Sequence, residues 1–408
     1  MVKINYIQSK SFSERIHVIY AMMLHQIQKD REKEILEELK DYQKKDLSFS
    51  SGRILGSMCG KPHPIAHKAY NLFLETNLGD PNIFKGTREI EKRFIFFIQN
   101  LLNAPPTAAG LIVSGGTEGN ITAMWVAKQL SQNNEIIIPA SAHFSFQKIA
   151  TMMDMKLKPI PLSKKYQIDV SQIKKRISSS TAAVVGIAGS TDLGTIDPIE
   201  ELSDICADEH IFLHIDAAFG GFIIPFLKEA GYEIPAFDFS LEGVSSISID
   251  THKMGYSAIP LGTIILREKE WIEEISVRSP CISSDTQAGI LGTRSGGPVA
   301  AGYAVSRYLG MEGYAEIVKH CMSTTKYTVK NLKKIGLTLV REPVLNVIVV
   351  RLKNPGKIVT LLEKEGWKVN KIDHLSSIRI VCMPTITKEI IDEFIDVLQM
   401  VCKKAGEL

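Results

Sequence analysis

Cysteine is sparse in this sequence, and its positions form no metal-binding or disulfide pattern. Six cysteines occur in 408 residues, and none belongs to a CxxC pair. This spacing excludes the common zinc sites, and thiols scattered in this way do not build the disulfide framework of a small secreted protein. We therefore expect no metal centre and a reducing, cytoplasmic location.

A charge excess and a long apolar run are also missing. The formal net charge of +3 is too small to indicate binding to nucleic acid or to an anionic membrane. No apolar run approaches the roughly 20 residues of a membrane span. The apolar stretch at residues 16–24 contains His17 and lacks a small-residue cleavage pattern, so it does not indicate a cleaved signal. We expect a protein that acts on a small molecule.

Short apolar runs alternate with helical patterns through most of the chain. This alternation predicts an α/β fold with a mostly parallel, doubly wound sheet. The expected strands of this sheet lie at residues 111–113, 136–139, 183–189, 211–216, 244–250 and 261–266.

Three parts are expected along the chain. Residues 1–50 are predicted to form an N-terminal helical arm, and residues 51–305 the large domain that contains the sheet. Residues 306–408 mix helices with short strands, which is typical of a smaller α+β domain. Its strands are expected at 337–341, 347–352 and 378–382.

Two of the predicted strands end in residues that suit one kind of catalysis. The run at 211–215 ends at Asp216, and the run at 244–249 leads to Lys253, 37 residues further on (253 − 216). The carboxyl ends of parallel strands meet at one edge of a sheet, where open α/β sheets bind ligands. Taken singly, a structural aspartate and a surface lysine are the alternative interpretation.

A lysine in this position indicates covalent chemistry with an aldehyde. At pH 7 a free lysine is neutral in roughly one molecule in a few thousand, so it is a poor nucleophile. A Schiff base with an aldehyde cofactor removes the need to deprotonate it at each turnover. Pyridoxal phosphate is such a cofactor, and it requires a carboxylate at its ring nitrogen.

Two further strand ends add to this site. Ser114–Asn120 follows the strand at 111–113 and contains two adjacent glycines and a threonine before a helix, which is typical of an anion-binding turn. It matches neither a Walker loop nor GxGxxG, which argues against nucleoside-triphosphate and NAD sites. His143 follows the strand at 136–139, although a histidine at a helix start is an equally good interpretation of it alone.

Seven segments together match a known family. They are Asn-Leu-Gly-Asp-Pro at 77–81, Ser-Gly-Gly-Thr-Glu at 114–118, Ala-His-Phe-Ser-Phe at 142–146, Asp-Ala-Ala-Phe-Gly-Gly at 216–221, Asp-Thr-His-Lys-Met-Gly at 250–255, Leu-Gly-Thr-Arg at 291–294 and Arg-Ile-Val-Cys-Met-Pro at 379–384. The set resembles the pyridoxal-phosphate-dependent group II amino-acid decarboxylases. Within them it is most like the archaeal L-tyrosine/L-aspartate decarboxylases, which are associated with methanofuran and coenzyme A biosynthesis. The resemblance runs from about Lys33 to about Lys403.

The resemblance implies a fold-type-I homodimer with active sites at the subunit interface, and it implies a role for each matched residue. Lys253 would carry the cofactor, Asp216 would pair with the pyridine nitrogen, and His143 would stack on the ring. The remaining cofactor contacts would be Gly116, Thr117 and His252 at the phosphate, Ala218 against the ring and Thr191 beside it. Arg379 would bind a substrate carboxylate, which suits its planar fork.

The sequence departs from the family in two places. Better-known relatives carry a loop tyrosine that protonates the product, but no tyrosine occurs between Tyr256 and Tyr303. His143 or Lys253 would then supply this proton. Cys281 stands where an aromatic residue is expected, which affects the choice of substrate side chain more than the reaction.

The predicted activity is therefore the α-decarboxylation of L-tyrosine to tyramine, of L-aspartate to β-alanine, or of both. L-Tyrosine is expected to be the better substrate, because a second carboxylate needs a buried cation and only Arg294 and Lys85 are candidates in sequence. Two alternatives remain at this stage. One is a carbon–carbon lyase of the sphingosine-phosphate type, and the other is a protein that binds pyridoxal phosphate without turnover.

Overall fold

The computed structural model of this chain describes residues 12–80, 82–280 and 286–408. The chain divides into two units, Met1–Ser51 and Gly52–Leu408. In the first unit α2 (Phe12–Gln43) is a single helix, and η1 (Phe49–Ser51) follows it. Within the described ranges, no helix is long and apolar enough to cross a membrane.

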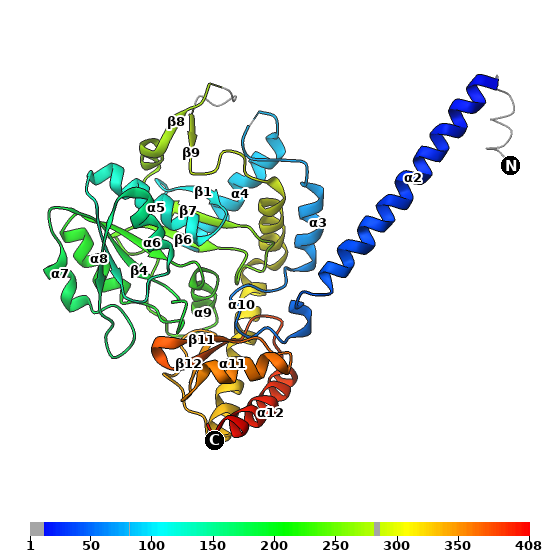
Figure 1. The fold of residues 1–408 in the computed structure, drawn as a ribbon. Helices are drawn as coiled ribbons and strands as arrows, with labels where there is room; N and C mark the ends of the chain where they lie inside the picture. The colour runs from blue at the N-terminus through cyan, green and yellow to red at the C-terminus, as the bar shows by residue number, and fades with distance from the viewer. Residues whose placement is uncertain (1–11, 81, 281–285) are drawn as a thin grey trace. The chain divides into compact units, whose positions relative to one another are not determined.

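A seven-stranded sheet forms the centre of the second unit (Figure 1). Its strands lie in the order β1-β7-β6-β5-β4-β2-β3, and β7 is antiparallel to both of its neighbours, whereas the others run parallel to one another. The predicted α/β fold class is thereby confirmed. The strands are β1 (Ala109–Val113), β2 (Glu135–Pro139), β3 (Lys156–Ile160), β4 (Thr181–Ile187), β5 (Phe212–Asp216), β6 (Val244–Asp250) and β7 (Gly262–Leu266).

Both faces of this sheet are covered, because its strands are apolar on both sides. Along β7, Ile265 packs into one hydrophobic cluster and its neighbours Ile264 and Leu266 into the other. Successive side chains of a strand point to opposite faces, so an uninterrupted apolar run is the pattern of a strand buried on both sides. The helices of this part are α3 (Pro64–Leu72), α4 (Lys85–Leu101), α5 (Gly116–Ser131), α6 (Ser145–Met153), α7 (Ile173–Arg176), α8 (Ile199–Asp208) and α9 (Ile224–Glu229).

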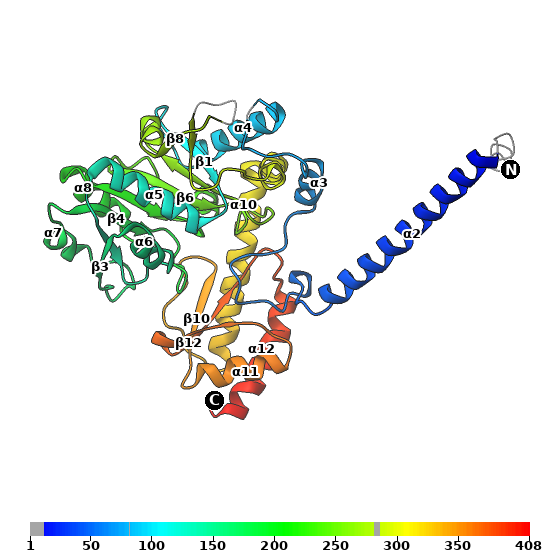
Figure 2. The ribbon, with the colours of Figure 1, turned by 45° about the horizontal axis from the view of Figure 1, so that its top comes forward.

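The C-terminal part of the second unit is built on a small antiparallel sheet. Helix α10 (Gly296–Lys334) leads into it and is interrupted at Gly310, whose φ of 59° favours glycine. The sheet has the order β10-β12-β11, with β10 (Val347–Arg351), β11 (Asn370–Ile372) and β12 (Ser377–Val381). Helices α11 (Pro355–Lys364) and α12 (Lys388–Ala405) accompany it (Figure 2).

Two expectations for the C-terminal part need comment. The predicted strand at 337–341 is wrong, because this segment contributes only an isolated bridge between Leu339 and Val350 at the edge of the sheet. The predicted domain boundary after residue 305 falls inside α10, and residues 52–408 form one compact unit. The three-part division therefore stays a prediction.

The segment that follows β7 leads to α10. It contains η4 (Lys269–Ile275) and a short hairpin formed by β8 (Ser276–Arg278) and β9 (Thr286–Ala288). Cys281, where the family pattern calls for an aromatic residue, lies outside the described residues, as does Pro81 of the segment at 77–81.

Candidate active site

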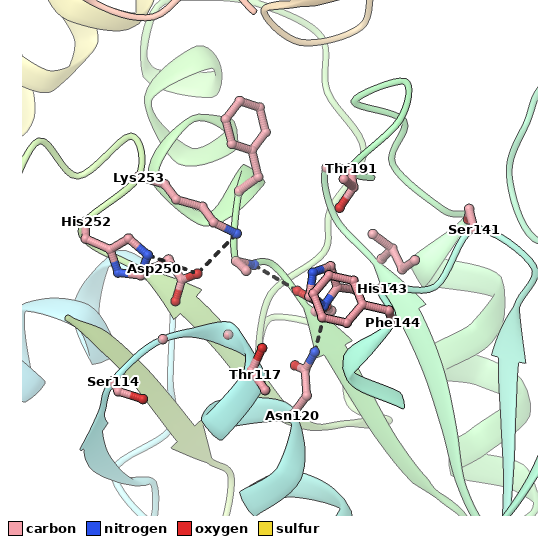
Figure 3. Close-up of a pocket in the computed structure, with 17 residues that line it drawn as sticks. Ser114, Thr117, Asn120, Ser141, His143, Phe144, Thr191, Asp250, His252 and Lys253 are labelled. Atoms are coloured by element: carbon pink, nitrogen blue, oxygen red, sulfur yellow. Dashed lines mark hydrogen bonds and ion pairs between the residues drawn. The ribbon is translucent and has the colours of Figure 1, made fainter. Parts of the chain in front are cut away.

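A cavity of about 390 Å³ lies at the carboxyl ends of the parallel strands, where the sequence placed the site (Figure 3). This volume is within the ~300–1,000 Å³ that is usual for small-molecule sites. The cavity therefore lies at the strand ends where the sequence predicted a ligand site. The site residues predicted from sequence that line it are Gly116, Thr117, His143, Thr191, Asp216, Ala218, His252 and Lys253.

The turn between β1 and α5 forms one wall of the cavity. A hydrogen bond stabilises this turn: the carboxylate of Glu118 accepts the backbone N–H of Ser114 at 2.7 Å. A Cβ atom at Gly116 would lie 2.9 Å from the Cβ of Ala218 and 3.2 Å from Oδ2 of Asp250. Only glycine fits at this position without displacing a neighbour. The first N–H groups of α5 have no partner within the helix, so the turn offers donors and space for an anion.

Lys253 reaches the cavity from the loop after β6 and lies beside a second carboxylate. Its Nζ is 3.1 Å from Oδ2 of Asp250, whose side chain is only 3 % exposed. Burial lowers the pKa of Lys253, but the carboxylates of Asp250 and Asp216 raise it, and the net pKa is above its usual value. Nε2 of His252 is 3.8 Å from the same Asp250 oxygen, and its Nδ1 is 2.8 Å from the carbonyl oxygen of Leu261.

Asp216 ends the fully buried strand β5 and presents its carboxylate to the cavity. Oδ2 accepts an N–H from Asn120 at 2.8 Å, and Oδ1 accepts the backbone N–H of Ala218 at 3.1 Å. An ionised carboxylate has about four acceptor positions. Two positions therefore remain for a further donor.

His143 lies on the opposite side of the cavity, in the loop between β2 and α6. Its Nδ1 accepts the backbone N–H of Ser145 at 3.2 Å, which leaves the ring proton on Nε2. Burial lowers the pKa of His143, although the charge of Asp216 opposes this effect. The imidazole is thus neutral, and its ring centroid is 4.0 Å from that of Phe144.

Thr191 lines the cavity, whereas Arg379 is not among its described lining residues. The guanidinium of Arg379 extends from β12 and donates through Nη1 to the carbonyl oxygen of Thr191 and through Nη2 to that of Gly56, the latter at 2.7 Å. Its Nε has no partner among the described residues, and Arg379 is absent from the described lining of the cavity. Arg379 is thus hydrogen-bonded to Thr191, a residue that lines the cavity. Its contact with a substrate carboxylate stays a prediction.

The two extra cations considered for a second substrate carboxylate lie elsewhere. Arg294 pairs with Glu91 at 3.2 Å and donates to the carbonyl oxygen of Ile112 at 3.0 Å. Lys85 is exposed at the start of α4. Neither belongs to the described lining of the cavity.

Sequence reasoning missed three residues of this site. Asp250, Asn120 and His214 appeared only inside longer segments, and none of them was given a role. A signal for His214 was available, since it precedes Asp216 by two positions in one strand and must share its face. Asn120 lies in the first turns of α5, after the glycines, and only the packing of α5 on β5 brings its amide to Asp216.

A family model matches more than half of the chain. Residues 86–353 match the model described as the pyridoxal-dependent decarboxylase conserved domain. A probable L-tyrosine/L-aspartate decarboxylase of Methanothermobacter thermautotrophicus is 46 % identical over 350 residues, which is 85 % of this chain and 96 % of the relative. An L-aspartate/L-glutamate decarboxylase of Pyrococcus horikoshii is also 46 % identical, over 90 % of this chain and 96 % of that protein.

The fold of a solved structure agrees with this match. A sphingosine-1-phosphate lyase of Burkholderia pseudomallei superimposes with a TM-score of 0.84 at 27 % sequence identity. The superposition covers 91 % of this chain and 90 % of the lyase.

Proposed function

The chain belongs to the family of pyridoxal-dependent decarboxylases, and we propose that it removes the α-carboxylate of L-tyrosine and L-aspartate, with L-tyrosine as the better substrate. It is a carboxy-lyase whose cofactor is pyridoxal 5′-phosphate. The observation that carries the proposal is the convergence of Lys253, Asp216, His143 and the glycine turn on one cavity.

The residues around the cavity fit the cofactor. The position of Gly116 leaves space that any side chain would fill, beside the free N–H groups of α5. Asp216 keeps unused acceptor positions on a buried carboxylate. When bound, pyridoxal phosphate supplies an aldehyde for amines and a ring that accepts the electron pair left by carbon dioxide.

We propose a role for each residue on this basis. Lys253 would bond to the cofactor through Nζ, and Asp216 would accept the N–H of the pyridine ring. Ala218 and His143 would lie against opposite faces of that ring, with Thr191 beside it. The phosphate would be held by Gly116, Thr117 and His252.

The proton that replaces the carboxylate at Cα would come from Nζ of Lys253. The raised pKa of Lys253 favours its ammonium form once the lysine is released from the cofactor, and Asp250 holds that charge at 3.1 Å. The other candidate, His143, is a neutral imidazole with a lowered pKa, so at neutral pH its protonated form is less populated than the ammonium form of Lys253.

The charge of the cavity supports L-tyrosine over L-aspartate. Arg379 would meet the α-carboxylate that both amino acids share. L-Aspartate carries a second carboxylate, whose burial without a cation costs several kcal/mol. Arg294 is already engaged by Glu91, and Lys85 is exposed away from the described lining.

A product assay tests this proposal. Purified protein, reconstituted with pyridoxal phosphate, is supplied with L-tyrosine, L-aspartate or L-glutamate, and carbon dioxide and the amine product are measured. Tyramine should form with the highest kcat/KM, and Lys253→Ala should form no product. A higher kcat/KM for L-aspartate would overturn the preference. Aldehyde release from a phosphorylated amino alcohol without carbon dioxide release would instead indicate a carbon–carbon lyase.

We also propose that the active enzyme is a homodimer. Large apolar side chains are exposed on and near α3 and α4, including Leu72 (80 %), Leu74 (62 %), Ile83 (68 %) and Phe96 (61 %). Exposed large apolar side chains on neighbouring segments favour a protein interface there. Light scattering should give twice the mass of the chain, and Phe96→Glu should shift the protein toward monomer, whereas Leu130→Glu on α5 should not.

The cellular setting remains part of the proposal. The five cysteines within the described residues are free thiols, which suits the cytoplasm. Tyramine and β-alanine would serve methanofuran and coenzyme A biosynthesis, as the sequence resemblance implies. Loss of the gene product should then create a requirement for one of these amines.

A further inference from the structure

A group of buried polar side chains lies beneath the cavity and is not explained by cofactor contacts. His214, Ser246 and Ser248 belong to β5 and β6, and each is 0 % exposed. Asn120 of α5 is 1 % exposed, and Ser145 of α6 is 0 % exposed. Burial of polar groups costs free energy unless every group finds a partner, so the partners of this group indicate what it does.

The side-chain amide of Asn120 uses all four of its hydrogen-bonding positions. Its Oδ1 accepts from Oγ of Ser248 and from Nε2 of His214, both at 2.9 Å. Its Nδ2 donates to Oγ of Ser145 at 3.1 Å and to Oδ2 of Asp216 at 2.8 Å. A flipped amide would place its oxygen against the carboxylate of Asp216. The partners of Asn120 therefore fix an N–H group toward Asp216 (Figure 3).

His214 determines the direction of the chain of hydrogen bonds. Burial lowers the pKa of His214 to about 4, so its imidazole is neutral. Because Nε2 donates to Asn120, Nδ1 must accept, and Oγ of Ser246 lies 2.8 Å from it. The donors then run from Ser246 through His214 and Asn120 to Asp216. Hydrogen bonds aligned in one direction polarise one another, and here the final acceptor is a carboxylate.

We propose that Asn120 and His214 are positioning residues that hold the carboxylate of Asp216 in one orientation, aimed at the pyridine nitrogen of the cofactor. This inference rests on the proposed role of Asp216. Without the N–H of Asn120, only the backbone N–H of Ala218 would remain as a donor to Asp216 among the described residues. A carboxylate held by fewer donors is less firmly oriented, so it makes a poorer hydrogen bond to the ring nitrogen and stabilises the protonated ring less.

The test measures the protonation state of the cofactor before any turnover. Wild type, Asn120→Ala and Thr122→Val are loaded with pyridoxal phosphate labelled with ¹⁵N in the ring, and the ¹⁵N chemical shift is recorded without substrate. We expect the pyridinium shift in wild type and a displacement toward neutral pyridine in Asn120→Ala. Thr122→Val changes a buried residue of the same helix that bonds only within α5, at the carbonyl oxygen of Glu118, so it should match wild type.

Kinetics provide the second readout. Asn120→Ala should lower kcat about 10- to 100-fold, as is common for residues that orient a catalytic group, with little change in KM. An unchanged ¹⁵N shift with a kcat within twofold of wild type would overturn the inference. If wild type itself does not retain the cofactor or decarboxylate, it is the proposed function that fails.

If Asn120→Ala does not fold, a pair of His214 variants tests the hydrogen bond from His214 to Asn120 instead. His214→Gln can still place an N–H near the position of Nε2, whereas His214→Phe removes both ring nitrogens. The glutamine variant should retain a ¹⁵N shift closer to wild type and a higher kcat than the phenylalanine variant. Equal values for the two folded variants would contradict a role for the hydrogen bond.

Discussion

Asp250 adds a second carboxylate to the cavity, and its place beside Lys253 affects the chain before the cofactor is bound. Oδ2 of Asp250 holds the ammonium of Lys253 at 3.1 Å, and Oδ1 has no partner among the described residues. A charged amine cannot attack an aldehyde. Asp250 should therefore slow the first capture of pyridoxal phosphate while it keeps a proton available on Lys253.

Asp250→Asn should make cofactor capture faster at mildly alkaline pH. The carboxylate raises the pKa of Lys253, so its removal lowers that pKa and increases the neutral fraction at a given pH. The rate of imine absorbance after mixing cofactor-free protein with pyridoxal phosphate, followed from pH 7 to 10, should reach its plateau at lower pH in the variant. Lys253→Ala serves as the control and should capture none. Coincident pH profiles of wild type and Asp250→Asn would exclude this effect.

His214 should make the stability of the cofactor-free protein depend on pH. Its folded-state pKa is lowered from 6.5 to about 4, so between these values the unfolded chain binds a proton that the folded chain does not. The contribution is present above pH 6.5 and is lost as pH falls toward 4, by about 2–3 kcal/mol at pH 4.5. Urea unfolding at pH 7.5 and 4.5 should reveal this loss in wild type but not in His214→Gln. Equal losses in both proteins would contradict the prediction.

At the scale of elements, the start of α5 is the proposed site of the cofactor phosphate. Gly116→Ala places a methyl group 2.9 Å from the Cβ of Ala218. Alanine favours helices more than glycine does, so the substitution should not lower the stability of α5. We expect pyridoxal phosphate affinity to fall by about tenfold or more, as measured by fluorescence titration.

Gly86→Ala is the matched control for this change. Gly86 lies in the first turn of α4, and a Cβ there would meet nothing within 4 Å. This variant should bind the cofactor as wild type does and gain about 0.5–1 kcal/mol of stability. A normal affinity in Gly116→Ala would exclude the close fit of the turn as part of the phosphate site.

The sequence predicted elements well where burial dominates. Residues of β4, β5 and β6 are buried on both faces, and the apolar residues that predominate in β4 and recur along β5 and β6 identify them. β3 was missed because it is an edge strand with two lysines, Lys156 and Lys158, and little apolar pattern. In the site, Asp216 and Lys253 follow from strand ends. The contact between Asn120 and Asp216 joins residues 96 positions apart, and no local pattern encodes it.

At the scale of the whole second unit, Arg379 connects the small sheet to the rim of the cavity. From β12 it bonds carbonyl oxygens of Thr191 and Gly56, which belong to distant parts of the chain. Its side chain is nearly buried, at 7 % exposure. A single guanidinium therefore fixes the position of Thr191 relative to the small sheet.

Arg379→Met should weaken turnover of every accepted amino acid. It removes the cation proposed for the shared α-carboxylate and leaves two carbonyl oxygens without their donors, a loss of about 1.5–3 kcal/mol or roughly 10- to 100-fold in kcat/KM. Steady-state kinetics with L-tyrosine and L-aspartate measure the loss. Arg351→Met, on β10 of the same sheet and bonded to Tyr166, should change neither. Unchanged kcat/KM for both substrates in Arg379→Met would reject the assignment.

The antiparallel strand β7 sets the distance between two neighbouring strand ends at the cavity. It lies between β1, which leads to the glycine turn, and β6, which leads to Lys253. With strands ~4.8 Å apart, one interposed strand separates the two flanking strands by ~9.6 Å. Gly262 at its start has no space for a side chain, since a Cβ would lie 2.8 Å from Oδ1 of Asp250. The sheet thus fixes the spacing between the strand end that carries the glycine turn and the strand end that leads to Lys253, and a ligand that reaches both must match this spacing.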